Sequence, residues 1–206
     1  MQFLAPIALG LGALGLGLAL KVVADDERKF DGGATWISQG GTPPWAAALY
    51  DGSVRIPARG LDRVTPALLG VLRHELAHAF VAERTGGNSP TWLQEGVAQW
   101  LEGVDLAAVD ARLAPIAARK QLLPLISLEG PFQGLAERDA NLAYAQSVSA
   151  VGFVLRQRGE PALVRLLSAL GDGLPSEEAL PVALALSYPE LQQVWETTLR
   201  LGAERR

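Results

Sequence analysis

The chain has 206 residues, of which 49% are hydrophobic and 19% are charged. This length and composition suit a single domain with a sizeable core, and they exclude a largely disordered chain. The net charge of −4 argues against a general nucleic-acid binder, and the absence of cysteine excludes disulfides, thiolate metal sites and cysteine nucleophiles.

The first twenty residues form an apolar leader. Residues 3–20 carry no charge, and Lys21 ends this run of 18 residues, which is at the lower limit for a membrane span. Val22 and Ala24 fit the small-residue pattern that precedes a signal cleavage site. However, no Lys or Arg precedes the run, and four glycines interrupt it, so a buried or unstructured segment is the alternative.

We therefore divide the chain into a leader over residues 1–20, which is a signal, an anchor or a buried segment, and one domain over residues 21–206. An exported or membrane-anchored protein, with a bacterial-type leader that associates with the membrane through residues 3–20, is favoured slightly over a cytoplasmic one. The oligomeric state stays open.

The predicted β-structure is confined to the N-terminal third. Residues 20–30 predict a short strand that runs into a charged turn, and residues 31–52, rich in Gly and Pro, predict loops around at most one more strand. Residues 53–57, "SVRIP", alternate apolar and polar side chains, as an edge strand does, and Pro57 suits a strand end.

From Thr65 onward the sequence predicts helices. Thr65 as N-cap and Pro66 as first residue predict a helix that ends near Gly86. Thr91 with Gln94 predicts a capping box for a second helix, which Gly103 stops. Further helices are expected over 105–120 (bent at Pro115), 139–158, 161–171, 176–186 and 187–202. The predicted fold class is α+β, with a small N-terminal β-sheet packed on a mainly helical body.

The stretch "RHELAHAFV" holds both histidines of the chain, His74 and His78, four positions apart with Glu75 between them. Residues four apart lie on one face of a helix, so the two imidazoles can aim at a common point about 2 Å away, as zinc requires. Glu75 leans over that point and can take a proton from a water that the metal activates. The alternative is an accidental pair of core or solvated histidines.

A catalytic zinc site needs a third protein ligand, and Glu95 is the candidate. The segment "VAERTGGNSP" reads as a helix stop and a turn, and "TWLQEGVAQW" begins the next helix, so a hairpin brings Glu95 back against the histidines. Gly96 and Ala98 are small enough to let these two helices approach closely. The competing explanation for Glu95 is a favourable charge near a helix N-terminus.

These motifs resemble the gluzincin metallopeptidases, and most closely the peptidase MA-like family. The match rests on "HELAH" followed by "PTWLQEGVAQW", which fits the family pattern Pro-x-Trp-Leu-x-Glu-Gly-x-Ala, and the likeness covers about residues 20–200. The resemblance implies a zincin-like domain with one zinc ion per chain, bound by His74, His78 and Glu95, with Glu75 as general base. It also implies that an edge strand, Val54 to Pro57 here, holds an extended peptide substrate.

The resemblance also bears on the roles expected for a tyrosine, two tryptophans and an arginine. Related enzymes often use a downstream Tyr or His to stabilise the oxyanion, and Tyr144 is the candidate here, with a core tyrosine as the equal alternative. Trp92 and Trp100 are expected to pack in the core, and Arg73 to be solvated.

Two positions depart from the family pattern. Gln94 stands where Asn is frequent, and Gln99 stands where thermolysin-like relatives have an Asp that hydrogen bonds to a zinc histidine. An amide supports a histidine ligand less than a carboxylate does. Glu102, one turn further, either reaches the histidine or does not.

The predicted function is hydrolysis of peptide bonds in peptide or protein substrates by a zinc-activated water. The alternative is a zinc-binding, weakly catalytic or non-catalytic module of the same fold that binds peptides, as a chaperone does. A third possibility is a helical membrane-associated protein in which the histidine pair is incidental.

Overall fold

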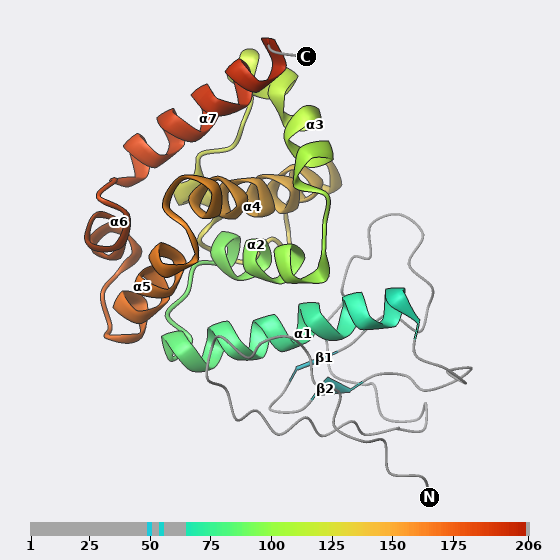
Figure 1. Cartoon of the computed structure of the whole chain (residues 1–206), viewed down its shortest axis with the longest axis vertical. Helices are drawn as coiled ribbons and strands as arrows, with labels where there is room; N and C mark the ends of the chain where they lie inside the picture. Colours follow the sequence, from blue (N-terminus) through green and yellow to red (C-terminus); the bar gives the residue numbers. More distant parts are fainter. Residues whose placement is uncertain (1–48, 51–53, 56–64, 205–206) are drawn as a thin grey trace, which may run out of the picture.

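Seven α-helices and one 3-10 helix make up the main part of the computed structural model, which describes residues 49–50, 54–55 and 65–204 (Figure 1). The α-helices are α1 (Pro66–Thr85), α2 (Thr91–Glu102), α3 (Leu106–Ala118), α4 (Glu137–Arg158), α5 (Glu160–Gly171), α6 (Ser176–Leu184) and α7 (Tyr188–Glu204), and the 3-10 helix is η3 (Leu125–Leu128).

Helix α1 begins and ends as the sequence predicts. The side chain of Thr65 caps it by accepting a hydrogen bond from the backbone N–H of Leu68 at 3.1 Å, and Pro66 is its first residue. At the other end Gly86 takes the left-handed conformation that a helix C-cap favours, with φ 59°. The predicted bounds of this helix are confirmed.

Helix α2 begins differently from the prediction. Pro90 is the N-cap, and Gln94 donates a hydrogen bond to the carbonyl of Ser89 at 2.9 Å instead of closing a capping box with Thr91. The N–H of Thr91 is satisfied by the carbonyl of Glu129, from the segment that follows η3. The predicted capping box is therefore wrong, because a tertiary partner replaces the local one. The predicted stop at Gly103 is confirmed, with φ 101°.

Helix α4 lies at the centre of the helical body and contacts α2, α3 and α5 (Figure 1). Residues 146–154 are buried without a break, which an amphipathic surface helix never shows. Gln146 is fully buried in this run, and its amide both donates to the carbonyl and accepts from the N–H of Leu123. Because α2, α3 and α5 pack around α4, the apolar faces of these helices are buried against it.

Close packing of α2 against α4 depends on Gly96. A Cβ at this position would collide with the carbonyl oxygen of Ser147 and with Cγ2 of Val151, both on α4. Gly96 therefore permits the contact of α2 with α4, and not the contact of α2 with α1 that the sequence suggested. On the α1 side the small residue is Gly70, whose Cβ position lies 3.5 Å from Cγ of Glu102.

The start of α2 is anchored by a buried tryptophan. Trp92 is completely buried, and its indole N–H donates to the hydroxyl of Tyr188 at the start of α7, at 3.0 Å. The Tyr188 hydroxyl in turn donates to the carboxylate of Glu129 at 2.7 Å. This chain of hydrogen bonds fixes the N-terminal end of α2, three residues before Glu95, against two other segments.

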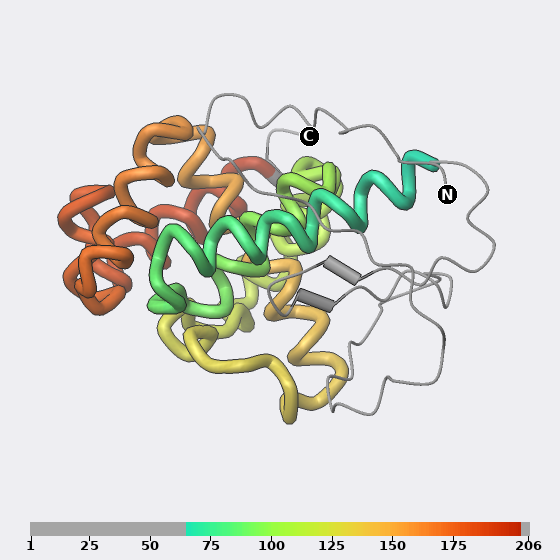
Figure 2. The backbone as a smooth tube through the Cα atoms, turned by 90° about the horizontal axis from the view of Figure 1, so that it is seen from below, coloured from blue at the N-terminus to red at the C-terminus, as the bar shows by residue number. Residues whose placement is uncertain are grey.

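The predicted α+β fold class is wrong, because the described chain is a helical structure. Its extended elements are two two-residue strands, β1 (Leu49–Tyr50) and β2 (Val54–Arg55), which pair antiparallel. A ladder of this length has no face large enough to cover a core, and helices bury the apolar surface instead. Both strands lie beside α1 (Figure 2).

Several predictions fall outside the described residues. These are the apolar leader, the strand within residues 20–30, the loops of residues 31–48, and Ile56 and Pro57 of the predicted edge strand. No helix in the described part of the chain combines the length and apolar character needed to cross a membrane. Export or membrane anchoring through residues 3–20 stays a prediction.

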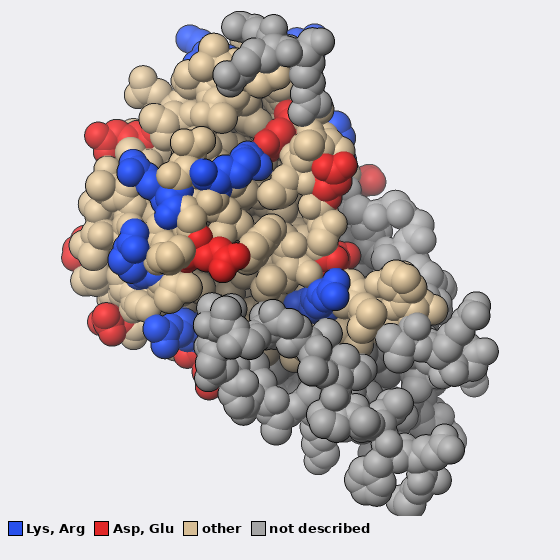
Figure 3. Space-filling view, in the orientation of Figure 1, with Lys and Arg blue, Asp and Glu red and all other residues tan. Residues whose placement is uncertain are grey.

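Charges of both signs are interspersed on the described part of the face shown in Figure 3. A mixed pattern differs from the single-sign field that draws a nucleic acid to a protein surface. The exclusion of a nucleic-acid partner, made from the net charge, stays a prediction.

We predict that Gly96→Ala destabilises the protein by about 1–3 kcal/mol, because the added methyl group has to displace backbone atoms of α4. Urea denaturation would measure this loss. Gly202→Ala on α7 is the matched control, since a Cβ there meets nothing within 4 Å, and a helical Gly→Ala change in open space is neutral or stabilising. Equal stability of the two variants would contradict the packing argument.

Candidate metal centre

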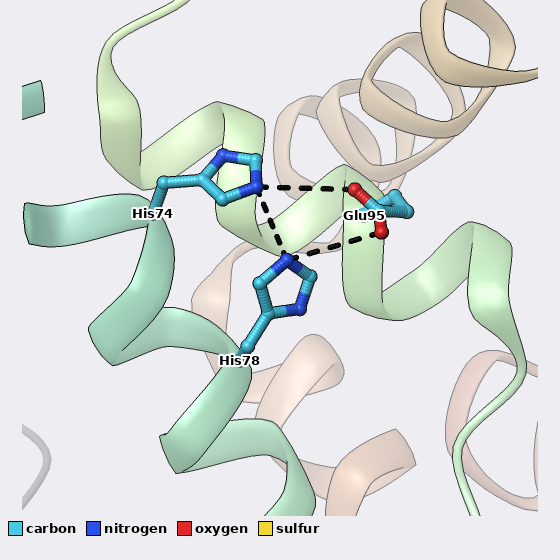
Figure 4. Close-up of side chains that lie close together, drawn as sticks. All are labelled: His74, His78 and Glu95. Carbon is cyan, nitrogen blue, oxygen red and sulfur yellow. Dashed lines mark hydrogen bonds and ion pairs between the residues drawn. The ribbon is translucent and has the colours of Figure 1, made fainter. Parts of the chain in front are cut away.

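The two histidines project from one face of α1 toward α2 (Figure 4). Gly70, His74 and His78 are spaced four residues apart, so they form a row along this face, and Gly70 lies next to Glu102 of α2 at one end of it. Their Nε2 atoms face each other at 3.1 Å, and the rings stand edge to face with centroids 4.8 Å apart. The two imidazoles therefore lie on one face of α1 with their Nε2 atoms close together, as the four-residue spacing predicts.

Glu95 of α2 completes a three-residue cluster with these histidines. Its Oε2 lies 3.9 Å from Nε2 of His74, and its Oε1 lies 3.8 Å from Nε2 of His78. Two ligands bound at about 2 Å to one tetrahedral ion are roughly 3.3 Å apart. The observed separations bracket that value, so small side-chain movements bring all three donor atoms onto one ion. The predicted hairpin therefore brings the predicted ligands together.

The helix-dipole explanation of Glu95 does not fit its position. Glu95 is the fifth residue of α2, not a first-turn residue as the sequence suggested, and the first turn of this helix contains no acidic residue. The attraction of a carboxylate to a helix N-terminus fades within the first turn. The side chain is also 8% exposed and turned toward the imidazoles, where a solvated charge has no reason to be.

Glu102 holds His74 from the other side of its ring. The Oε2 of Glu102 lies 3.0 Å from Nδ1 of His74. If this carboxylate accepts, the proton is on Nδ1, and the neutral form of the ring then offers its Nε2 lone pair to a metal. A carboxylate in this position is the common support of a zinc-binding histidine.

Gln99 does not take the supporting role. Its amide nitrogen donates to the carbonyl of Glu95 at 3.2 Å and to the carbonyl of Tyr144 at 3.0 Å. Gln99 thus ties α2 to α4, and the carboxylate beside His74 belongs to Glu102. One signal for this contact was present in the sequence, because Glu102 is seven residues after Glu95, hence two turns along on the same face of α2.

Burial shifts the pKa values of the cluster. Burial raises the pKa of Glu95 to about 7, partly opposed by the positive charge of His74. Burial lowers the pKa of His78 to about 4, with help from His74. Burial also lowers the pKa of His74, but the hydrogen bond to Glu102 and the charges of Glu95, Glu102 and Glu75 outweigh it, so the net shift is upward.

The donor set and its charge fit a divalent cation. Two imidazole nitrogens and one carboxylate oxygen form a set that zinc accepts readily, and the three ligand atoms all lie within 4.8 Å of one another. Three carboxylates, those of Glu75, Glu95 and Glu102, lie near the two imidazoles, and burial raises the pKa of Glu75 and of Glu95 because it disfavours their negative charge. A bound dication would supply the compensating positive charge.

Glu75 and Tyr144, the two other candidates, lie within electrostatic range of the ligands. Glu75 is 7% exposed, and burial raises its pKa to about 7, with smaller effects from His74, Glu95 and Glu102. Tyr144 is half-buried, and burial together with the charge of Glu95 raises its pKa to about 12. Its ring packs edge to face on Phe132, with centroids 5.1 Å apart.

The remaining sequence predictions concern packing. Trp92 is a core residue, as predicted, and Trp100 is partly buried against the same core. Arg73 is exposed, in agreement with a solvated side chain.

Comparison with protein families gives an independent result. The model of the Peptidase MA superfamily matches residues 62–201, which is more than half of the chain. The chain belongs to the Peptidase MA superfamily. No curated protein and no solved structure matches it with significant similarity. The matched region begins before α1 and ends within α7, so it includes every residue of the cluster.

Membership of the Peptidase MA superfamily supports a peptidase-like enzyme, and the cluster is a possible metal site of such an enzyme. The family assignment of the sequence analysis is thereby confirmed. The motif that suggested it, His-Glu-x-x-His, is present in the chain at residues 74–78.

We predict that purified protein binds about one equivalent of zinc and that Glu95→Ala lowers the zinc affinity by at least tenfold, because two imidazoles alone make an incomplete site. Metal analysis after dialysis against a weak chelator measures the zinc that the wild type and Glu95→Ala each retain. Glu83→Ala, an exposed residue of α1, is the control. Less than a tenth of an equivalent in the wild type would rule out a metal centre.

We predict that Glu102→Gln weakens zinc binding by about 10–100-fold while leaving the stoichiometry at saturation unchanged, because the carboxylate orients His74 but does not bind the ion. Chelator competition measures the affinity. A Gln99→Ala variant serves as comparison, since Gln99 bonds only to backbone carbonyls in the described structure. A larger loss of affinity in Gln99→Ala than in Glu102→Gln would reverse these two roles.

Proposed function

We propose that this protein is a zinc-dependent peptidase of the gluzincin type. The observation that carries the proposal is the convergence of His74, His78 and Glu95 from two helices, inside a chain that belongs to the Peptidase MA superfamily. Cysteine is absent, and the ligands are nitrogen and oxygen donors, so zinc is the best match among common catalytic metals.

Zinc, when bound, polarises a substrate carbonyl and makes a water molecule acidic enough to react near neutral pH. The residues of the chain supply the rest of the chemistry. His74 and His78 offer lone pairs from one helix face, and Glu102 keeps the proton of His74 on Nδ1, away from the ion. Glu95 contributes a carboxylate that is deprotonated once a cation neutralises it.

Glu75 is the proposed general base. A base that works at neutral pH needs a pKa near 7, and burial raises the pKa of Glu75 to about that value. With a pKa near the working pH, the carboxylate can take a proton from the attacking water, and the resulting carboxylic acid can give that proton to the leaving amine. Glu75 follows His74 directly in the chain, so it is held beside the ligands by the same helix.

Tyr144 is the proposed donor to the oxyanion of the tetrahedral intermediate. Its raised pKa keeps the phenol protonated throughout the working pH range, so its hydroxyl can donate. The contact with Phe132 restricts the ring, and the hydrogen bond from Gln99 to its carbonyl fixes its backbone near Glu95. A fixed donor of this kind contributes roughly 3–4 kcal/mol to lowering the barrier.

The substrate is proposed to be an extended peptide. Strand β2 (Val54–Arg55) lies beside α1, the helix that carries both histidines, and its backbone is already extended (Figure 2). Main-chain pairing to a strand gives affinity with little sequence preference.

The non-catalytic alternative loses part of its support. It rested on the small size of the chain and on the neutral Gln99 in place of a carboxylate, and the carboxylate of Glu102, 3.0 Å from Nδ1 of His74, weakens the second of these reasons. A buried base with a pKa near 7 is also unnecessary for a module that only binds peptides. We therefore favour the peptidase.

We predict that Glu75→Gln lowers kcat on a labelled casein substrate by about 10²–10⁴-fold, because the proton of the attacking water loses its acceptor. Zinc content should remain at one equivalent, which separates this variant from a ligand variant. Chelation should abolish the activity of the wild type, and added zinc should restore it. Glu178→Gln, exposed on α6, is the control, and unchanged turnover by Glu75→Gln would exclude Glu75 as the base.

A further inference from the structure

Asn141, on α4, carries the one buried side-chain nitrogen or oxygen in the described part of the chain that has no hydrogen-bond partner, its Oδ1. Other buried polar side chains are satisfied. Gln146 bonds twice to Leu123, Ser147 donates to the carbonyl of Ala143, and Ser149 donates to Asp110. Since native proteins satisfy nearly all such groups, an orphan amide needs an explanation.

A structural role does not account for Asn141. It is the fifth residue of α4, inside the helix, where Asn is neither a cap nor a favoured residue. Its oxygen accepts no hydrogen bond from the core. An apolar side chain of the same size would avoid the desolvation of this amide, so folding alone gives no reason for Asn here.

The position of Asn141 points to the catalytic side of α4. It precedes Tyr144 by three residues, and residues three apart are neighbours on a helix face. The amide nitrogen of Gln99 bonds to both the Tyr144 and the Glu95 carbonyls, at 3.0 and 3.2 Å, so this part of α4 lies directly beside the third metal ligand. Asn141 is therefore one helical turn from Tyr144, the residue whose carbonyl bonds to Gln99.

The hydrogen-bonding groups of a primary amide indicate the class of ligand that Asn141 would bind. An Asn side chain offers one acceptor and two donors without charge, which complements the N–H and C=O of a peptide group. A phosphate or carboxylate ligand would call for a cationic side chain instead. Rotation of the amide by half a turn about χ2 exchanges its oxygen and nitrogen, so that either can face a ligand.

We propose that Asn141 is a substrate-positioning residue, whose amide hydrogen bonds to the main chain of an extended peptide bound between α4 and the metal ligands. The inference rests on the proposed peptidase function and deepens it. It assigns recognition of the substrate backbone to α4, in addition to the strand beside α1. A change of side-chain rotamer would turn the unpartnered oxygen of Asn141 toward the bound peptide, which would give it a partner.

The test compares zinc-loaded, full-length wild type with Asn141→Leu, Asn141→Ala and the control Gln157→Ala, an exposed amide of the same helix. Initial rates on fluorescein-labelled, unfolded casein give KM and kcat. We expect both Asn141 variants to raise KM about tenfold, the loss of one or two hydrogen bonds, and to change kcat by less than threefold. Gln157→Ala should match the wild type.

Zinc content and melting temperature separate positioning from a structural role. We expect one equivalent of zinc in every variant and no loss of stability in Asn141→Leu, because that change removes an unsatisfied buried group. The inference is overturned if KM is unchanged in both variants. It is also overturned if both lose stability or zinc in proportion to their activity.

The peptidase proposal and the role proposed for Asn141 can be tested separately. If zinc-loaded wild type does not cleave casein, the peptidase proposal is wrong, and fluorescence anisotropy of the same labelled casein then decides the role of Asn141. Binding by the wild type that weakens about tenfold in Asn141→Leu supports it as a peptide contact. Absent or equal binding refutes it.

Discussion

The burial of carboxylates beside two imidazoles is the constraint on which this structure depends. Glu75 and Glu95 are removed from water, and burial raises the pKa of each from 4.5 to about 7. Desolvation of this kind costs free energy unless a positive charge compensates it. His78 cannot provide the charge, since burial lowers its pKa to about 4, whereas the pKa of His74 is raised and its charge offsets part of the desolvation. A cation bound between these side chains would offset the rest.

The packing around α2 maintains this constraint. Trp92 is fully buried and bonded to Tyr188, which fixes the start of the helix, while the missing side chain at Gly96 lets the helix lie against Ser147 of α4. Between these two contacts the backbone of Glu95 has little freedom to retreat toward solvent. The ligand therefore stays buried because the apolar and backbone contacts on either side of it are stronger than the tendency of one carboxylate to regain water.

Local signals in the sequence were sufficient for most helix ends and for the common face of His74 and His78, and tertiary contacts decided the rest. Thr65 and Gly103 act on their own neighbours, so helix ends at these positions were predictable, and the four-residue spacing of His74 and His78 fixes their common face. The capping box failed because Glu129, distant in sequence, bonds to the N–H of Thr91. The predicted sheet failed because an alternation of five residues cannot show whether a partner strand of useful length exists. Glu102 required the crossing of α1 and α2, which no single segment encodes.

The two helices packed on α2 have different parts in the proposed chemistry. Helix α1 provides both histidines and the base, and α2 adds the carboxylate ligand as well as the carboxylate behind His74. Helix α4 contributes no member of the cluster within the described residues, yet the carbonyl of Tyr144 bonds to Gln99, whose amide also bonds to the carbonyl of Glu95, and Asn141 precedes Tyr144 by one helical turn. Gln99 and Gly96 thus connect α2 to α4, and these contacts have to be kept if Glu95 is to stay in place. Positions of α4 outside these contacts can change without moving the two helices that carry the cluster, so they are the ones through which the preference for a substrate can vary.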